Sequence, residues 1–262
     1  MRVWTFGCSM TEYAWPTWAD ILVNHCKEQG HQAENWGRSG AGNQFIIAKI
    51  MECHAKNILG PNDYVLVCFS SFFRNDYYVQ ERGWYLPGRL QDNIVKHHKK
   101  KEIAYHIDPI HYAIRDCSSI ASIKLALENL GVKFLFWFWN DYHIPVEEIP
   151  SNDTATFDTV ISTFKELIRT DIPNLDGVVY RKFKFDSFYN EQSPAPEIHP
   201  LPSEHLKFVK DNLLGRLDWI DKDTFINTEK FVEDWENKIK SYNGSIALDT
   251  TGWKIERKNQ WN

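Results

Sequence analysis

The sequence contains little cysteine and no long hydrophobic run. Its five cysteines are an odd number without a Cys-x-x-Cys pair, which argues against a disulfide-stapled domain. The most apolar stretch, residues 132–139, is far too short to cross a bilayer, and the first residues contain no apolar run long enough for a signal peptide. We therefore expect reduced, mostly buried thiols in a cytoplasmic protein that binds no membrane.

An excess of positive charge is also missing. The chain has 30 Lys+Arg against 35 Asp+Glu, a formal net charge of −5, which disfavours binding of nucleic acid. With 43% hydrophobic and 25% charged residues and no internal repeat, its 262 residues can bury a sizeable core. Aromatic residues are abundant, at 15% with 11 Trp, which indicates a heavy aromatic core or surfaces that stack on sugars or bases.

Strand-like and helix-like patterns alternate along most of the chain. Short β-rich or continuously apolar runs predict strands at 2–6, 33–36, 63–69, 133–139 and 178–183. Amphipathic runs predict helices at 15–29, 45–58, 109–130, 156–170, 203–219 and 223–242, with Ser203 as the N-cap of the fifth helix. This alternation predicts a three-layer α/β fold with a mainly parallel sheet.

The organisation of the chain follows from where this alternation is interrupted. Residues from about 70 to 108 are irregular, tyrosine-rich and charged, and we interpret them as an insertion after the third strand. We expect one domain over residues 1–220 that includes this insertion. Residues 221–262 are then a C-terminal extension, consisting of a helix and a polar tail.

Candidate site residues follow the expected strands, because parallel sheets form their sites at the carboxyl ends of strands. Ser9, after the first strand, can supply a nucleophilic hydroxyl and a backbone N–H, or simply act as a cap. The glycine-rich loop 37–42, after the second strand, can offer an N–H to an oxyanion or bind phosphate. It has neither the Lys-Ser/Thr ending of a P-loop nor the GxGxxG spacing.

A proline-rich loop near residue 200 carries two histidines. His199 and His205 lie in the segment Glu197-Ile198-His199-Pro200-Leu201-Pro202-Ser203-Glu204-His205, just before a predicted helix. Proline restricts the backbone, which favours the fixed geometry that a general base needs. A structural role is the alternative for each histidine.

Together these segments resemble the SGNH (GDSL-like) hydrolase family, which has a flavodoxin-like α/β fold and includes esterases, lipases, deacetylases and acyltransferases. Gly7-Cys8-Ser9 matches its Gly-Asp-Ser block with cysteine in place of aspartate, and residues 35–40 match Asn-x-Gly-x-Ser-Gly. His199-Pro200, with His205 six residues after His199, matches the last block. The resemblance implies that Ser9 is the nucleophile, that His199 is the general base, and that the N–H of Gly40 joins the oxyanion hole.

Two departures from the family pattern leave roles open. The family carboxylate stands three residues before the base, where this chain has proline; Glu197 is the nearest substitute, Asp186 is another candidate, and a dyad without a carboxylate is the third option. The asparagine that the family places after the third strand has three candidate replacements: Ser71, Arg74 and Asn75. Arg74 is also a candidate substrate-binding residue.

The resemblance implies a serine esterase that needs no cofactor or metal and acts on a small-molecule or glycan ester. Aromatic residues of the insertion favour an O-acyl carbohydrate, because such side chains can stack on pyranose rings: Tyr77, Tyr78, Trp84 and Tyr85. A non-catalytic module that binds glycans or another protein is the main alternative, and nucleotide binding by loop 37–42 is a third. The oligomeric state stays open.

Overall fold

The computed structural model describes residues 1–72, 74, 76–80, 83–86, 109–139, 154–168, 199–217, 219–220 and 225–241. The elements of this part, in chain order, are β1 (Arg2–Gly7), α1 (Trp18–Glu28), β2 (Gln32–Asn35), α2 (Asn43–Ala55), β3 (Tyr64–Phe69), β4 (Tyr77–Val79), β5 (Gly83–Tyr85), α5 (Pro109–Asn129), β6 (Lys133–Phe138), α6 (Thr154–Phe164), α8 (Pro202–Phe208), the π-helical turn η2 (Val209–Leu213) and α9 (Ile226–Ser241).

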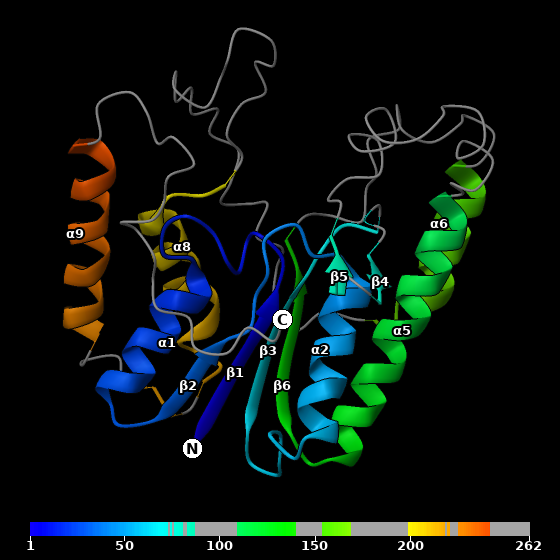
Figure 1. Ribbon diagram of the computed structural model, residues 1–262, viewed down its shortest axis with the longest axis horizontal. Helices are drawn as coiled ribbons and strands as arrows, with labels where there is room; N and C mark the ends of the chain where they lie inside the picture. The colour runs from blue at the N-terminus through cyan, green and yellow to red at the C-terminus, as the bar shows by residue number, and fades with distance from the viewer. Residues whose placement is uncertain are drawn as a thin grey trace, which may run out of the picture.

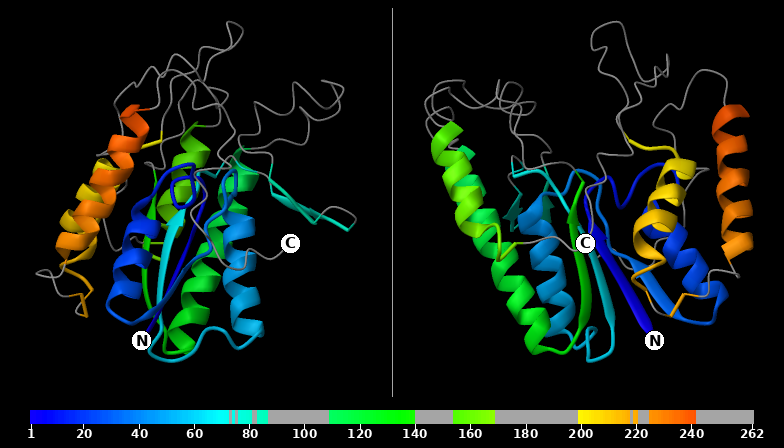
Figure 2. Two further views of the ribbon diagram at one scale, coloured as in Figure 1. Left: turned by 60° about the vertical axis from the view of Figure 1, so that its left-hand side comes forward. Right: turned by 180° about the vertical axis from the view of Figure 1, so that it is seen from behind.

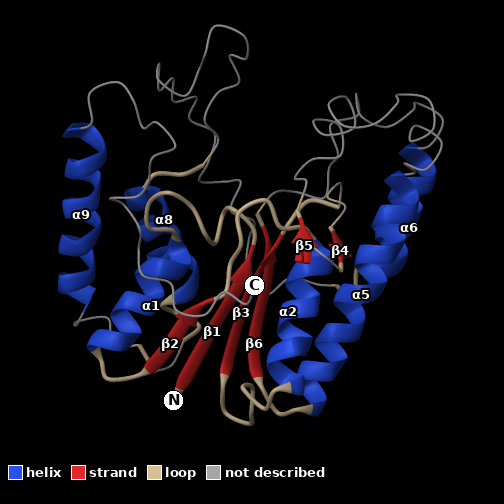
Figure 3. Cartoon of the chain, in the orientation of Figure 1, coloured by secondary structure: helices blue, strands red, loops and turns tan. Residues whose placement is uncertain are grey.

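Four strands form a parallel sheet in the order β2-β1-β3-β6. A flavodoxin-like sheet has the strand order 2-1-3-4-5, and β2, β1, β3 and β6 occupy its first four places. The register pairs Thr5 with Asn35, and Gly7 with Cys68, so the strands end at a common edge (Figure 3). The loops that follow β1, β2 and β3 therefore start next to one another. The strand expected at 178–183 lies outside the described residues.

Helices cover both faces of this sheet. Helices α1, α8 and α9 lie on one side, and α2, α5 and α6 lie on the other (Figure 1). The prediction of a three-layer α/β fold with a mainly parallel sheet is confirmed. Within the described residues, no helix combines the length and the apolar character that crossing a membrane requires.

The sheet is apolar because both of its faces are covered. Every residue of β3 is buried, as expected for a strand between two helical layers. Aromatic rings fill much of this core: Phe69 meets Phe136 edge-on at 5.0 Å between ring centroids, and Trp18 meets Trp137 in the same way at 4.6 Å. All five cysteines are buried and unbridged.

Five of the six predicted helices begin one to three residues away from the expected position, and the N-caps of α1 and α8 show why. Helix α1 starts at Trp18, and the Asp20 carboxylate accepts the backbone N–H of its N-cap, Thr17, at 3.1 Å. Helix α8 starts at Pro202 after the N-cap Leu201, so the assignment of Ser203 as N-cap is wrong. Proline suits the first helical position because the missing N–H would have no intrahelical partner there.

The region expected to be irregular contains a small hairpin. Strands β4 and β5 pair antiparallel, with Tyr78 opposite Trp84. The hairpin projects from the body of the molecule beyond α2 (Figure 2, left). Its three-residue strands are too short to give a readable alternation in the sequence.

Candidate active site

Ser9 lies in a tight turn directly after β1. The Cys8 carbonyl accepts the N–H of Thr11 at 2.8 Å, which folds the chain back over the end of the strand. Glycine is required before this turn: a methyl group on Gly7 would lie 2.0 Å from Thr11 Oγ1 and 2.8 Å from the Cys68 carbonyl oxygen. Ser9 itself is 6% exposed, so the turn keeps this residue almost completely buried.

The side chain of Asn35, at the end of β2, fixes this turn. Its Nδ2 donates to the Thr11 carbonyl at 2.7 Å and to Asp20 Oδ1 at 2.9 Å, while its Oδ1 accepts the Gly37 N–H at 2.9 Å. The Thr17 hydroxyl donates to the same Thr11 carbonyl at 2.6 Å. Asn35 thus connects the turn after β1, the first turn of α1 and the start of the second loop.

The second loop lies against the first. The Arg38 N–H donates to the Gly7 carbonyl at 2.9 Å, and the Glu12 carboxylate accepts the N–H of Ser39 at 2.5 Å. Gly40 has a φ of +82°, a left-handed conformation that side-chain-bearing residues rarely adopt. The Gly40 segment is therefore held beside the turn that carries Ser9.

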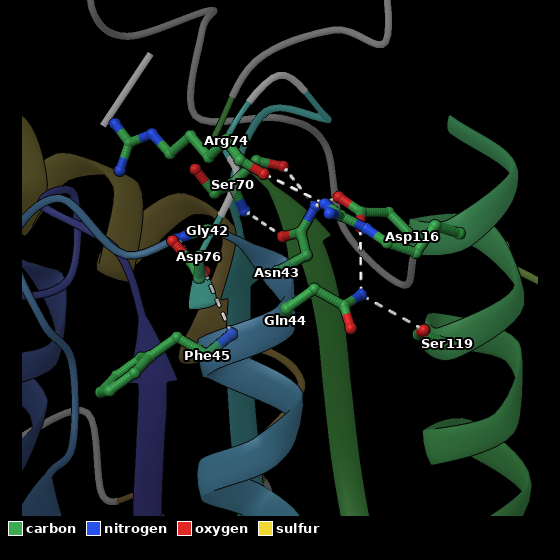
Figure 4. Close-up of polar contacts among 10 residues, drawn as sticks. Gly42, Asn43, Gln44, Phe45, Ser70, Arg74, Asp76, Asp116 and Ser119 are labelled. Carbon is green, nitrogen blue, oxygen red and sulfur yellow. Dashed lines mark hydrogen bonds and ion pairs between the residues drawn. The ribbon is translucent and has the colours of Figure 1, made fainter. Parts of the chain in front are cut away.

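The end of β3 is fixed by an asparagine of α2 (Figure 4). Asn43 Oδ1 accepts the Ser70 N–H at 2.8 Å, and its Nδ2 donates to the Ser70 carbonyl at 3.0 Å and to Asp116 Oδ2 at 2.9 Å. The fully buried Asp116 also accepts hydrogen bonds from Gln44 and Arg115. Burial raises the pKa of Asp116, and these donors oppose that rise.

Asp76 caps the N-terminus of α2. Its Oδ2 accepts the N–H of Gly42 at 2.7 Å and that of Phe45 at 3.1 Å (Figure 4). Burial raises the pKa of Asp76 to about 6, although the two N–H donors and the nearby Arg74 favour its charged form. Arg74 Nη1 donates to the Ala41 carbonyl at 2.7 Å. The chain on both sides of position 75 is thus attached to the second loop.

The histidine segment meets the loop after β1. The ring of Tyr13, four residues beyond Ser9, stacks on His199 with centroids 3.7 Å apart and planes at 14°. Trp15 Nε1 donates to the Pro200 carbonyl at 2.7 Å. His205 is buried, and burial lowers its pKa to about 3, with the charge of the neighbouring His199 as the second cause.

The predicted site residues fall into two groups. The structure connects the loops of Ser9, Gly40 and His199 by direct contacts, and it places Arg74 on the Gly40 loop and the half-buried Ser71 just after β3. Candidates outside the described residues are Asn75, Glu197 and Asp186. Among the described residues, no group of three or more His, Cys, Asp or Glu is placed to hold a metal ion.

Three buried side chains that organise the site were not predicted: Asn43, Asp76 and Asp116. No local pattern in the sequence marks them, because their contacts lie far apart: Asp76 bonds residues 31 and 34 positions away, and Asn43 and Asp116 are 73 positions apart.

No family model matches the chain, and no curated protein matches it. Several solved structures align with most of this chain. The structure of TesA aligns with 88% of this chain and 99% of its own at 13% identity and a TM-score of 0.44. Axe2, an acetylxylan esterase from Geobacillus stearothermophilus, aligns with 84% of this chain and 96% of its own at 13% identity and a TM-score of 0.43. A lipolytic protein of the G-D-S-L family from Veillonella parvula covers 83% and 100% at 14% identity and a TM-score of 0.40.

Proposed function

We propose that the chain is a serine esterase of the SGNH type, with Ser9 as nucleophile and His199 as general base. The observation that carries this proposal is the meeting of three loops on the turn after β1. That turn contacts the Gly40 loop through the Arg38 N–H and the Gly7 carbonyl, and it contacts His199 through the ring of Tyr13. An alcohol, an imidazole and a glycine amide on converging loops are the parts that acyl transfer requires.

The proposed reaction proceeds through an acyl-enzyme. Ser9 Oγ forms a bond to the ester carbonyl carbon while its proton passes to the His199 imidazole, and the carbonyl electron pair moves onto oxygen. The backbone N–H groups of Ser9 and Gly40 stabilise that oxyanion. When the ester C–O bond breaks, His199 returns the proton to the leaving alkoxide. Water, activated by the same imidazole, then releases the acid and restores Ser9.

Asn75 is the candidate that we favour for the third oxyanion donor. Both of its neighbours hold the Gly40 loop, because Arg74 donates to the Ala41 carbonyl and Asp76 accepts the Gly42 N–H. These contacts hold the chain on both sides of position 75 against the loop that carries Gly40, which is why Asn75 is favoured over the alternative donor, Ser71. Glu197 is proposed as the carboxylate that orients His199, with Asp186 as its alternative.

A fluorophosphonate probe tests the nucleophile directly. We expect one equivalent of probe to label the protein at Ser9, because a serine activated by a general base attacks phosphorus as it attacks a carbonyl. Intact-protein mass gives the stoichiometry, and peptide mapping gives the position. Ser9→Ala should not label, and His199→Ala should label far more slowly than the wild-type protein.

The matched control is Ser122→Ala, which removes the hydroxyl of an exposed serine on α5 that bonds its own helix. This variant should label like the wild-type protein. Labelling that is absent in the wild-type protein, or that survives Ser9→Ala, would refute the proposed nucleophile. Absence of labelling together with retained binding of glycans would favour the non-catalytic module instead.

For the substrate we propose an O-acyl carbohydrate that stacks on the β4–β5 hairpin. Tyr78 is 63% exposed, and its ring meets the edge of Trp84, which in turn meets Phe45 of α2 at 5.5 Å between centroids. The residue after β5, Leu86, lies over Gly40: a methyl group on that glycine would be 3.3 Å from the Leu86 carbonyl. An exposed, supported aromatic ring beside an ester-cleaving site is suited to the apolar face of a sugar.

Tyr78→Ala should raise KM for an O-acetylated oligosaccharide by about 3- to 10-fold, the value of one aromatic stacking contact. KM for p-nitrophenyl acetate should stay unchanged, because that substrate does not extend to the hairpin. Tyr78→Phe is the matched control, since it keeps the ring and should keep the wild-type KM. Equal KM values for Tyr78→Ala and the wild-type protein on the oligosaccharide would exclude the hairpin as the sugar subsite.

A further inference from the structure

Trp15 connects two segments that lie far apart in sequence. It precedes α1, and its side chain is completely buried. Its indole Nε1 donates to the Pro200 carbonyl at 2.7 Å, a hydrogen bond between residues 185 positions apart. The acceptor belongs to the residue directly after His199. Trp15 therefore fixes the carbonyl of the residue that follows the proposed general base.

The ring of Trp15 also acts on His199 through Tyr13. Tyr13 meets Trp15 edge to face, with centroids 4.6 Å apart and planes at 79°, and stacks flat on the imidazole of His199. The edge-to-face contact between Tyr13 and Trp15 is a favoured arrangement of aromatic rings. Trp15 thus fixes the backbone after His199 directly, and it fixes one face of the imidazole through Tyr13.

Helix α9 buries Trp15 and keeps these contacts in place. Ile239, which is 4% exposed, packs on Trp15 together with Trp235 and Leu201. At the same end of the helix, Glu236 Oε1 accepts the N–H of Ser203 at 2.9 Å, in the first turn of α8. Figure 1 shows α9 beside α8, on the side of the sheet that α1 also covers.

The other end of α9 is also anchored. Thr228, which is fully buried, forms a hydrogen bond with the ring Nδ1 of His25 on α1 at 3.1 Å. Lys210 of η2 pairs with Glu229. Helix α9 is therefore anchored at both ends and packs against Trp15 and the segment that follows His199.

We propose that Trp15, held under α9, is a positioning residue for His199, and this proposal rests on the proposed esterase function. Trp15 sits in the chain between Ser9 and α1, so it connects the nucleophile loop and the general-base segment through one rigid side chain. A displacement of about 1 Å in such a group can cost about 10²-fold in rate. The active centre consequently depends on α9, which the sequence analysis placed in a C-terminal extension.

Trp15→Phe tests the proposal, because it removes the indole N–H and keeps an aromatic ring. We expect kcat for ethyl acetate to fall by about 10- to 100-fold with KM unchanged, since the completely buried Trp15 offers no surface to a substrate. The fall should be smaller for p-nitrophenyl acetate. Its leaving group departs without a proton, whereas an ethoxide needs the proton that a well-placed His199 delivers.

Trp18→Phe is the matched control. Trp18 is also fully buried and lies three residues further on, but its indole Nε1 has no hydrogen-bond partner among the described residues. Both substitutions remove the same buried atoms, and Trp15→Phe also loses the hydrogen bond to Pro200, so it should lower the melting temperature more than Trp18→Phe does. Only Trp15→Phe should lower kcat. Equal kcat values for the two variants, or a parallel loss in both, would overturn the positioning role.

A second measurement does not depend on esterase activity. The stacked Tyr13 ring should shift the His199 imidazole protons upfield in the NMR spectrum of the full chain, and Tyr13→Leu should abolish that shift. Trp15→Phe should reduce it, whereas Trp18→Phe should not. An unchanged shift in Trp15→Phe overturns the positioning role, even in an active protein. A reduced shift in a protein without esterase activity would support the contact and refute the proposed function.

Discussion

Ser9→Ala and His199→Ala should each lower kcat for p-nitrophenyl acetate by about 10⁴- to 10⁶-fold, and the double variant should be no slower than the slower single one. The reason is that the hydroxyl and the imidazole act as one unit: without the base the hydroxyl stays protonated, and without the hydroxyl the base has nothing to activate. The residual rate should come from the oxyanion donors and from substrate binding alone.

Steady-state kinetics on the wild-type protein and all three variants measure these losses. The wild-type kcat is calculated per fluorophosphonate-reactive molecule, and the variant kcat values are compared with it. Ser122→Ala and His54→Ala serve as controls, because they change the same residue types on α5 and α2, away from the site. Losses that multiply in the double variant would mean that Ser9 and His199 act independently. The proposed mechanism would then be wrong.

Much of the fold could be predicted from the sequence, because the sheet is buried on both faces. The near-continuous apolar run at 63–69 has no polar face to present to solvent, and the buried parallel strand that it predicted is confirmed as β3 (Tyr64–Phe69). The hairpin could not be predicted, since three-residue strands carry too little pattern. The start of α1 was misplaced because Trp15 fits the apolar spacing of the helix while its ring packs elsewhere.

The position of the candidate site could also be predicted from sequence, but its supports could not. Residues that follow parallel strands must meet at one edge of the sheet, which is why the Ser9 and Gly40 loops could be paired in advance. The contacts that hold those loops, such as Asn43 with Asp116 and Trp15 with Pro200, join residues 73 and 185 positions apart. Such pairs depend on how the helices pack, which local patterns do not encode.

Acid should destabilise the protein through His205. This residue is 1% exposed, and its burial lowers its pKa to about 3, with the His199 charge as a further cause. The unfolded chain takes up a proton on this imidazole below about pH 6.5, whereas the folded protein does not until about pH 3. The contribution of His205 to the free energy of unfolding is therefore complete above pH 6.5 and falls by ~1.4 kcal/mol per pH unit below it, ~5 kcal/mol in all.

His205→Gln removes this titration and should flatten the dependence on pH. Between pH 7 and pH 4, the free energy of unfolding of the variant should fall by ~3 kcal/mol less than that of the wild-type protein. Urea unfolding at both pH values measures the difference. Any constant cost of placing glutamine in the core cancels, because only the change with pH within each protein is compared. Identical pH dependence in the two proteins would contradict a neutral His205 in the folded state.

Asp76 provides a control of opposite sign. Its pKa is raised to about 6 from 3.8, so the folded protein gains a proton before the unfolded chain does, and Asp76 adds stability as the pH falls through 6. Asp76→Asn should abolish this gain and make the fall in stability between pH 7 and pH 4 steeper by ~2 kcal/mol. The asparagine Oδ1 can still accept the N–H groups of Gly42 and Phe45, so the cap of α2 is retained. The two variants should thus bracket the wild-type protein, with His205→Gln the least and Asp76→Asn the most sensitive to acid.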